Sequence, residues 1–144
     1  MGMDPILTRG AADAMLAEAA GAHPKEACGL LFGTRGQGVE GQERITAIRP
    51  AANVAEDPTR HFEIDPATLI AALREERAGA GGAGLALLGW YHSHPVGEAL
   101  PSAQDRACAS GDGRIWAIIA QGQVRLWRDC AHGFEMLPTC LAPG

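Results

Sequence analysis

Two histidines, a serine and an aspartate lie close together in one stretch of the chain, Gly89 to Asp105. His92 and His94 follow a run of apolar residues, which predicts that they close a buried strand. Residues two apart on a strand share a face and lie about 6.6 Å apart, so both imidazoles can reach one ion at about 2.0–2.1 Å. Ser102 and Asp105 follow at a spacing that shares one helical face. We therefore predict a zinc site with two imidazoles and a carboxylate as ligands, a nearby hydroxyl and one open position.

Each of these residues also has a purely structural interpretation. Strand histidines can simply be satisfied by hydrogen bonds, and Asp105 can be a first-turn carboxylate that the helix dipole stabilises. Proline followed by Ser-x-x-Asp is the pattern of a helix N-cap at Ser102. The spacing of His92 and His94, followed by the serine and the aspartate, favours a metal site. For Ser102, capping alone and capping combined with a contact to substrate both stay open.

An open zinc site also needs a group that takes a proton from water, and this group is usually a glutamate. Glu26 lies between a predicted helix and a predicted buried strand, which is an unusual place for an unpaired charge. The other glutamates considered lie in predicted loops or on exposed helix faces: Glu40, Glu43, Glu63, Glu75 and Glu76. Spacing alone therefore favours Glu26 only modestly as the general base.

The whole chain has 144 residues, which predicts one domain over residues 1–144 with a core of its own. A net charge of −5 without a basic run disfavours nucleic acid and anionic membranes as partners. No apolar run approaches the roughly 18 residues of a membrane span, and no signal-peptide pattern is present, so we expect a cytoplasmic protein. The four cysteines lack CxxC spacing and are expected to be free thiols in or near the core.

Hydrophobic periodicity and turn residues predict the elements that must position the site. Their mixture indicates a mixed α/β sheet with helices packed on it. Helices are expected over residues 8–20, 66–78 and 102–111, and strands over 28–33, 43–49, 61–64, 85–94, 115–120, 124–129 and 134–137. Residues 34–41 are expected to form a hairpin loop, residues 79–84 a flexible linker, and the chain from Pro138 onward a loose tail.

With Glu26 included, the sequence resembles the JAMM (MPN-plus, JAB1/Mov34) zinc metallopeptidases, in particular their small bacterial single-domain members. The family signature is a glutamate before a Gly-Leu-Leu-like strand, then His-x-His, seven residues that begin with proline, Ser, two residues and Asp. The matching segments here are Glu26-Ala27-Cys28-Gly29-Leu30-Leu31, His92-Ser93-His94, Pro95 to Pro101, Ser102 and Asp105. Asn53, Pro58, Phe62 and Asp65-Pro66 also resemble the small bacterial members.

The resemblance implies a role for each of these site residues. His92, His94 and Asp105 would bind one Zn²⁺ per chain, with water as the fourth ligand. Glu26 would act as general base and acid, and Ser102 would help to stabilise the tetrahedral oxyanion. The implied fold is a curved mixed sheet flanked by helices, the JAMM/MPN fold, which is similar to that of cytidine deaminases.

The implied reaction is hydrolysis of the peptide or isopeptide bond after the C-terminal diglycine of a ubiquitin-like β-grasp protein, by a zinc-activated water. It would serve deconjugation or precursor processing. An alternative is release of an amino acid such as cysteine from the C-terminus of a sulfur-carrier protein, which needs the same chemistry. A non-catalytic module that binds ubiquitin-like proteins is disfavoured, because every ligand of the motif is present.

Overall fold

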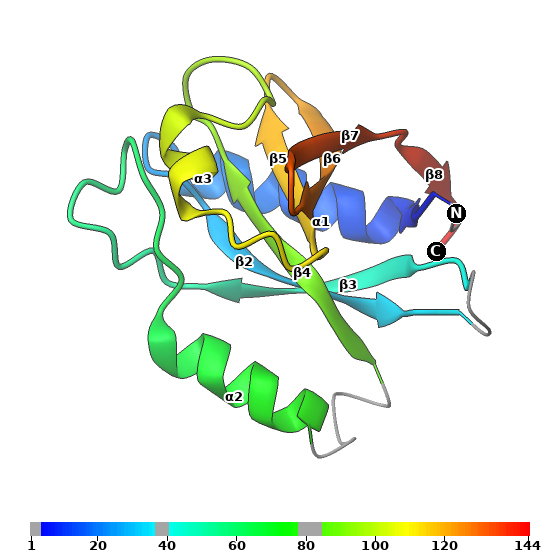
Figure 1. The fold of residues 1–144 in the computed structure, drawn as a ribbon. Coiled ribbons are helices and arrows are strands. Elements are labelled where there is room, and N and C mark those ends of the chain that lie inside the picture. The colour runs from blue at the N-terminus through cyan, green and yellow to red at the C-terminus, as the bar shows by residue number, and fades with distance from the viewer. Residues whose placement is uncertain (1–3, 37–40, 78–84) are drawn as a thin grey trace.

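The computed structural model describes residues 4–36, 41–77 and 85–144. Eight strands of these residues form one sheet in the order β7-β6-β5-β4-β2-β3-β1-β8, with helices packed on it (Figure 1). The predicted mixed α/β fold is therefore confirmed. In chain order the elements are β1 Ile6–Thr8, α1 Arg9–Ala22, β2 Cys28–Thr34, β3 Arg44–Ala51, α2 Pro66–Arg77, β4 Ala86–Ser93, α3 Ala103–Cys108, β5 Ile115–Ala120, β6 Gln123–Cys130, β7 Gly133–Leu137 and β8 Cys140–Ala142.

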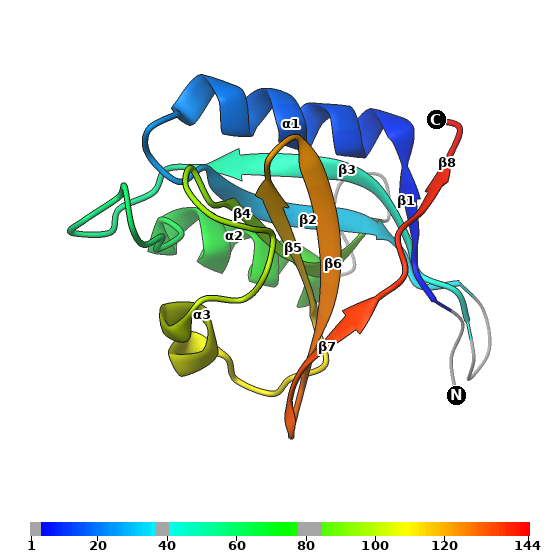
Figure 2. The ribbon, with the colours of Figure 1, turned by 90° about the horizontal axis from the view of Figure 1, so that it is seen from above.

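Helices α1 and α2 cover opposite faces of the sheet (Figures 1 and 2). Side chains alternate along β2, so Leu31 packs in one core cluster with Met15 of α1. Its neighbours Leu30 and Phe32 pack in another cluster with Ala72 of α2. Because both faces are covered, β2 has the continuous apolar sequence of a strand buried on both sides.

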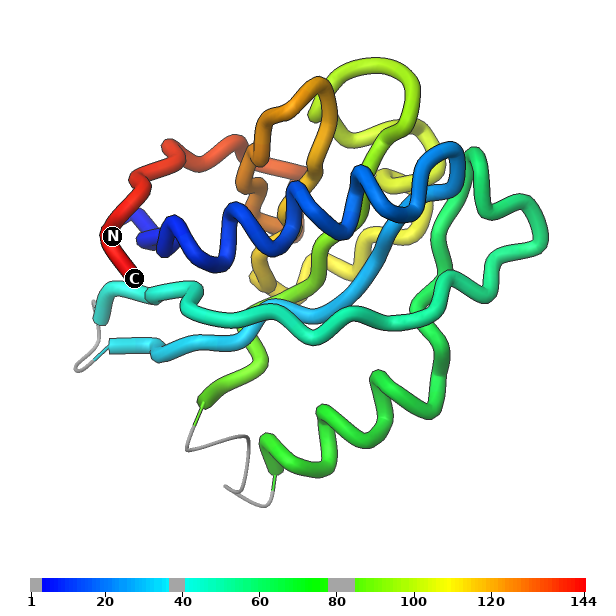
Figure 3. Tube along the Cα trace, turned by 180° about the vertical axis from the view of Figure 1, so that it is seen from behind, coloured from blue at the N-terminus to red at the C-terminus, as the bar shows by residue number. Residues whose placement is uncertain are grey.

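The two outermost strands of the sheet, β7 and β8, follow one another in the chain. The sheet therefore curls until its two edges are joined by a short connection, which Figures 2 and 3 show at the N-terminal end of α1. Strand β8 pairs in parallel with β1, with Ile6 opposite Cys140. The prediction of a loose tail from Pro138 is thus wrong, and β1 was not predicted. Three-residue strands are too short to produce a detectable period of two.

Strand β4 lies inside the sheet, between β2 and β5, and leads to the predicted site. It runs antiparallel to β2 and parallel to β5. A Cβ atom on Gly89 would lie 1.8 Å from the carbonyl oxygen of Ile115, so only glycine lets these two backbones approach so closely. At the end of β4 the Ser93 N–H donates to the carbonyl of Ala27 at 3.0 Å. This pairing brings the residue after Glu26 beside the histidine motif.

Other predicted elements differ in extent from the observed ones. The strand expected over residues 61–64 is reduced to a single bridge between Asn53 and Ile64. Helix α3 ends at Cys108 and not near Gly111, whose N–H donates to the buried Asp129 carboxylate at 3.0 Å. The linker expected over residues 79–84 lies outside the described residues. Among the described helices, none has the length and apolar character that a membrane crossing requires.

Candidate metal and catalytic site

The side chains of His92, His94 and Asp105 converge at the end of β4 and the first turn of α3. The two histidine Nε2 atoms lie 3.2 Å apart. The Asp105 Oδ2 atom lies 3.0 Å from Nε2 of His92 and 3.2 Å from Nε2 of His94. His92 and Asp105 are buried and His94 is partly exposed. The spacing that the sequence suggested for a metal site is thus present in three dimensions.

This group has the size and chemistry of a zinc site. Tetrahedral ligands bonded at about 2.0–2.1 Å lie about 3.3 Å from one another, close to the three distances observed here. His94 Nδ1 lies 2.8 Å from the carbonyl oxygen of Glu98. Because a carbonyl oxygen only accepts, Nδ1 carries the proton and Nε2 keeps the lone pair that a metal needs. The residues present therefore fit a zinc ion.

The ring of His92 is held by an aromatic contact and not by a hydrogen bond of the kind that holds His94. Its Nδ1 atom is buried and has no hydrogen-bond partner among the described residues. Instead, the ring of Phe62 stacks on it with centroids 4.2 Å apart and an interplanar angle of 15°. Burial lowers the pKa of His92, although its hydrogen bond and charge interaction with Asp105 act in the opposite direction. A lowered pKa keeps the imidazole neutral, as metal ligation requires.

Ser102 and Asp105 form a capping box at the start of α3. The Asp105 N–H donates to Ser102 Oγ at 3.0 Å, and the Ser102 N–H donates to Asp105 Oδ2 at 2.9 Å. Burial raises the pKa of Asp105, but the interactions with the neighbouring His92 and His94 and the hydrogen bond from the Ser102 backbone N–H outweigh it and hold that pKa well below 3.8. The cap thus fixes the carboxylate in its ionised form toward the two imidazoles.

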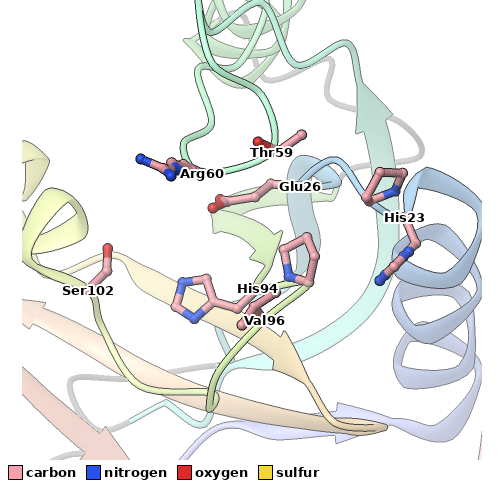
Figure 4. A pocket seen from close by; sticks show the side chains of 9 residues that line it. His23, Glu26, Thr59, Arg60, His94, Val96 and Ser102 are labelled. Carbon is pink, nitrogen blue, oxygen red and sulfur yellow. The ribbon is translucent and has the colours of Figure 1, made fainter.

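Glu26 lies just before β2, and its side chain is on the wall of the cavity shown in Figure 4. Only 6% of the residue is exposed. Burial raises the pKa of Glu26 from 4.5 to about 7; His94 opposes this rise and Asp105 adds to it. A carboxyl group with such a pKa exchanges protons near neutral pH, as a general base and acid must.

The cavity has a volume of about 550 Å³ and brings Glu26, His94 and Ser102 together. Figure 4 shows these three side chains around one opening. The rest of the lining comes from the turn after α1, from the loop before α2 and from the segment after β4: His23, Pro24, Thr59, Arg60, Pro95 and Val96. All five predicted site residues therefore belong to one region. Glu26 and Ser102 lie on the cavity wall, and the group of His92, His94 and Asp105 lies at the edge of the cavity, which His94 lines.

Three residues that support this site were not assigned any task from the sequence. The Ser93 hydroxyl accepts a hydrogen bond from the Ala27 N–H at 2.8 Å and so joins the segment of Glu26 to the histidine motif. Phe62 stacks on His92. Asn53 donates to the carbonyl of Glu26 at 3.0 Å. Ser93 had a signal, because it lies between the two histidines and must face the opposite side of the strand.

The cysteines differ from the prediction of thiols in or near the core. Cys28 is buried, whereas Cys108 and Cys140 are exposed and Cys130 is intermediate; all four are free. Burial raises the pKa of Cys28 to about 12, and Glu26 adds to this rise. Cys130 belongs to a second, more exposed group that could hold a metal ion, together with His132 and Glu135 in the hairpin of β6 and β7.

Comparison with solved structures defines the class of fold. The chain resembles a JAB1/MPN domain protein of Archaeoglobus fulgidus with a TM-score of 0.60 and 16% identity, covering 98% of this chain and 99% of that one. It resembles a protein of Desulfitobacterium hafniense with a TM-score of 0.79 and 29% identity, covering 96% of this chain and 93% of that one. The sheet and helices are those of a JAB1/MPN domain.

Residues 8–130 match the family described as prokaryotic homologs of the JAB domain, and the chain belongs to this family. It is 37% identical over 100 residues to a desampylase of Haloferax volcanii, covering 69% of this chain and 66% of that protein. It is 40% identical over 83 residues to a probable TtuB-protein conjugate cleaving protease of Thermus thermophilus, covering 57% of this chain and 47% of that protein. The chain thus spans between about half and two thirds of these relatives.

Proposed function

We propose that the protein is a zinc-dependent peptidase or isopeptidase that hydrolyses the bond after the C-terminal Gly-Gly of a ubiquitin-like β-grasp protein. The observation that carries this proposal is that the buried Glu26 shares one cavity wall with His94 and Ser102, beside the group of His92, His94 and Asp105 that could hold a metal ion. The names of the relatives, a desampylase and a conjugate-cleaving protease, support the same substrate class. We further propose that residues 1–144 form a single domain and act in the cytoplasm, where free thiols persist.

We assign the metal to His92, His94 and Asp105, one Zn²⁺ per chain. When bound, zinc supplies Lewis acidity toward a carbonyl and a water of lowered pKa. Glu26 accepts the proton of the attacking water and returns it to the amine that leaves. Its burial serves this task, because a carboxylate that is poorly solvated binds a proton more tightly than an exposed one.

Ser102 combines capping with a second task. Its oxygen accepts the hydrogen bond of the Asp105 N–H, and this leaves its own O–H proton free. We assign that proton to the carbonyl oxygen of the scissile bond, where negative charge develops as water attacks. The capping hydrogen bond then holds the hydroxyl in place before substrate arrives.

The cavity lining agrees with an extended, small-residue tail as substrate. Pro24 and Pro95 contribute rigid apolar surface, and Val96, which is 89% exposed, extends it outward. Glycine is the residue that passes most easily where a backbone must approach a wall closely. A Gly-Gly terminus would bring its last carbonyl to the site without a side chain to accommodate.

Arg60 favours a second candidate, release of an amino acid such as cysteine from a sulfur-carrier terminus. Its side chain lines the same cavity and is 79% exposed. An amino acid joined to the carrier through its α-amine has an α-carboxylate close to the scissile bond, and a guanidinium can bind it. A lysine joined through its ε-amine has no carboxylate so close to that bond. Arg60→Ala should therefore raise KM for the amino-acid adduct and leave the isopeptide substrate unchanged.

The proposal is tested with two substrates made from one β-grasp protein ending in Gly-Gly. One carries a peptide on a lysine ε-amine and the other carries cysteine on the terminal carboxyl. Zinc-loaded protein should cleave at least the first, and Glu26→Gln should lose about 10²–10⁴-fold in kcat. Glu56→Gln, which changes an exposed acid in the loop before α2, is the matched control and should retain full activity.

Zinc stoichiometry is best measured in a Cys130→Ser background, which removes the thiol of the second group that could hold a metal ion. One zinc per chain is expected there, and none in the same background with His92→Ala. Cleavage of both substrates by metal-free Glu26→Gln protein would overturn the proposal.

A further inference from the structure

The side-chain amide of Asn53 is fully used in hydrogen bonds to backbone groups, one of which belongs to Glu26 on the cavity wall. Its Nδ2 atom donates to the carbonyls of Glu26 and His61, each at 3.0 Å. Its Oδ1 atom accepts from the N–H groups of Ala55 at 3.0 Å and Glu63 at 3.1 Å. A primary amide offers two donor protons and one oxygen with two lone pairs, so all of its capacity is taken.

These bonds organise the segment 53–63, and this segment binds both the N–H and the carbonyl of Glu26. The Glu26 N–H donates to the carbonyl of Pro58 at 2.7 Å, and the Glu26 carbonyl accepts from Asn53. Both peptide groups next to the Glu26 Cα atom are thus tied to one segment. The direction in which the Glu26 side chain leaves the backbone depends on that segment.

The same segment also orients one of the metal-binding side chains. Phe62 lies between His61 and Glu63, and the backbones of both residues bond to the Asn53 amide. Its ring stacks on His92, whose Nδ1 has no hydrogen-bond partner among the described residues. Metal-binding histidines usually fix their ring by a hydrogen bond from the second ring nitrogen. In His92 the stacking of Phe62 takes the place of that hydrogen bond.

We infer that Asn53 is a positioning residue that sets the general base Glu26 and the ring of His92 relative to each other. One Nδ2 donor acts on Glu26 and the other acts on His61. The Oδ1 acceptor holds Glu63, on the other side of Phe62, and so acts through Phe62 on His92. This inference rests on the proposed function for its kinetic consequences, but its structural part concerns the chain alone.

The effects of the Asn53 nitrogen and of the Asn53 oxygen can be separated by substitution. Asn53→Asp keeps an oxygen for the N–H groups of Ala55 and Glu63 but places a second oxygen against the carbonyls of Glu26 and His61. We expect kcat of the zinc-loaded protein to fall by about 10- to 100-fold, with the zinc dissociation constant within about threefold of wild type. Phe62→Leu should show the opposite pattern, with zinc affinity weakened by about 10-fold or more.

Asp129→Asn is the matched control, because Asp129 is another buried side chain that ties down a loop. Its carboxylate accepts from the N–H groups of Ser110 and Gly111, each at 3.0 Å, far along the chain from Glu26. This variant should lose stability without changing kcat, zinc affinity or the pH dependence of the folded enzyme. A loss of kcat in Asp129→Asn equal to that in Asn53→Asp would overturn the inference.

Amide hydrogen exchange gives a readout that does not depend on hydrolysis. The Glu26 N–H should exchange at least about 10-fold faster in Asn53→Asp than in wild type, because its partner Pro58 belongs to the released segment. Unchanged exchange at Glu26 would overturn the positioning role. If wild-type protein binds zinc but cleaves neither substrate, the proposed function fails, and the exchange and zinc affinities still decide the inference.

Discussion

Replacing Glu26 with glutamine should make the metal-free protein more stable at pH 8, although it lowers kcat of the zinc-loaded protein. The pKa of Glu26 is about 7 in the folded protein, against 4.5 for the exposed group. Below pH 4.5 both states are protonated and no cost arises. As the pH rises toward and beyond 7, the folded state must bury a charge that the unfolded state exposes to water. At about 1.4 kcal/mol per pKa unit, this cost is about 3 kcal/mol.

The assay is urea denaturation of metal-free wild type, Glu26→Gln and the exposed control Glu56→Gln at pH 5 and pH 8. Wild type should lose stability between these two pH values relative to Glu26→Gln, which should be about 3 kcal/mol more stable at pH 8. The exposed control should follow wild type at both. With saturating zinc the difference should shrink, because a nearby dication favours the carboxylate. A Glu26→Gln protein that is less stable than wild type at pH 8 would refute this reasoning.

Three further outcomes follow from the same contacts. Ser102→Asn keeps a capping oxygen, so the unfolding free energy should change by less than about 1 kcal/mol while kcat falls about 10-fold or more; unchanged kcat would leave Ser102 as a cap only. Zinc at about 1,000 times its dissociation constant should raise the unfolding free energy by about 4 kcal/mol, and Asp105→Asn should remove this gain; calorimetry showing the same gain in both proteins would exclude Asp105 as a ligand. Gly89→Ala should cost more than about 3 kcal/mol, because its Cβ would lie 1.8 Å from the Ile115 carbonyl oxygen; a soluble variant with wild-type melting behaviour would contradict this.

Much of the sheet could be predicted because its strands have strong local patterns. The apolar run Ile115–Ala120 is buried at every position and has the length of a strand. Helix α2 begins at Pro66, as the Asp-Pro pair predicted. The histidine spacing was informative for the same reason, since the period of two along β4 decides which side chains share a face.

What could not be predicted depends on contacts between distant segments. The Ser93 hydroxyl meets a backbone N–H 66 residues away, and Asn53 meets the Glu26 carbonyl 27 residues away. Strand β1 pairs with β3 and β8, and β8 pairs with β1, and no local period records these distant partners. The raised pKa of Glu26 could not be predicted either, because it is caused by burial in the assembled fold.

The thiol of Cys28, two residues after Glu26, is buried and therefore unreactive toward electrophiles. Burial raises its pKa to about 12, so the reactive thiolate is scarce at pH 7. Alkylating reagents and peroxides should therefore modify the exposed Cys108 and Cys140 and leave the neighbourhood of Glu26 untouched. Cys108 is the last residue of the helix that carries Asp105. A maleimide dye attached there would report on that helix as metal is added or removed.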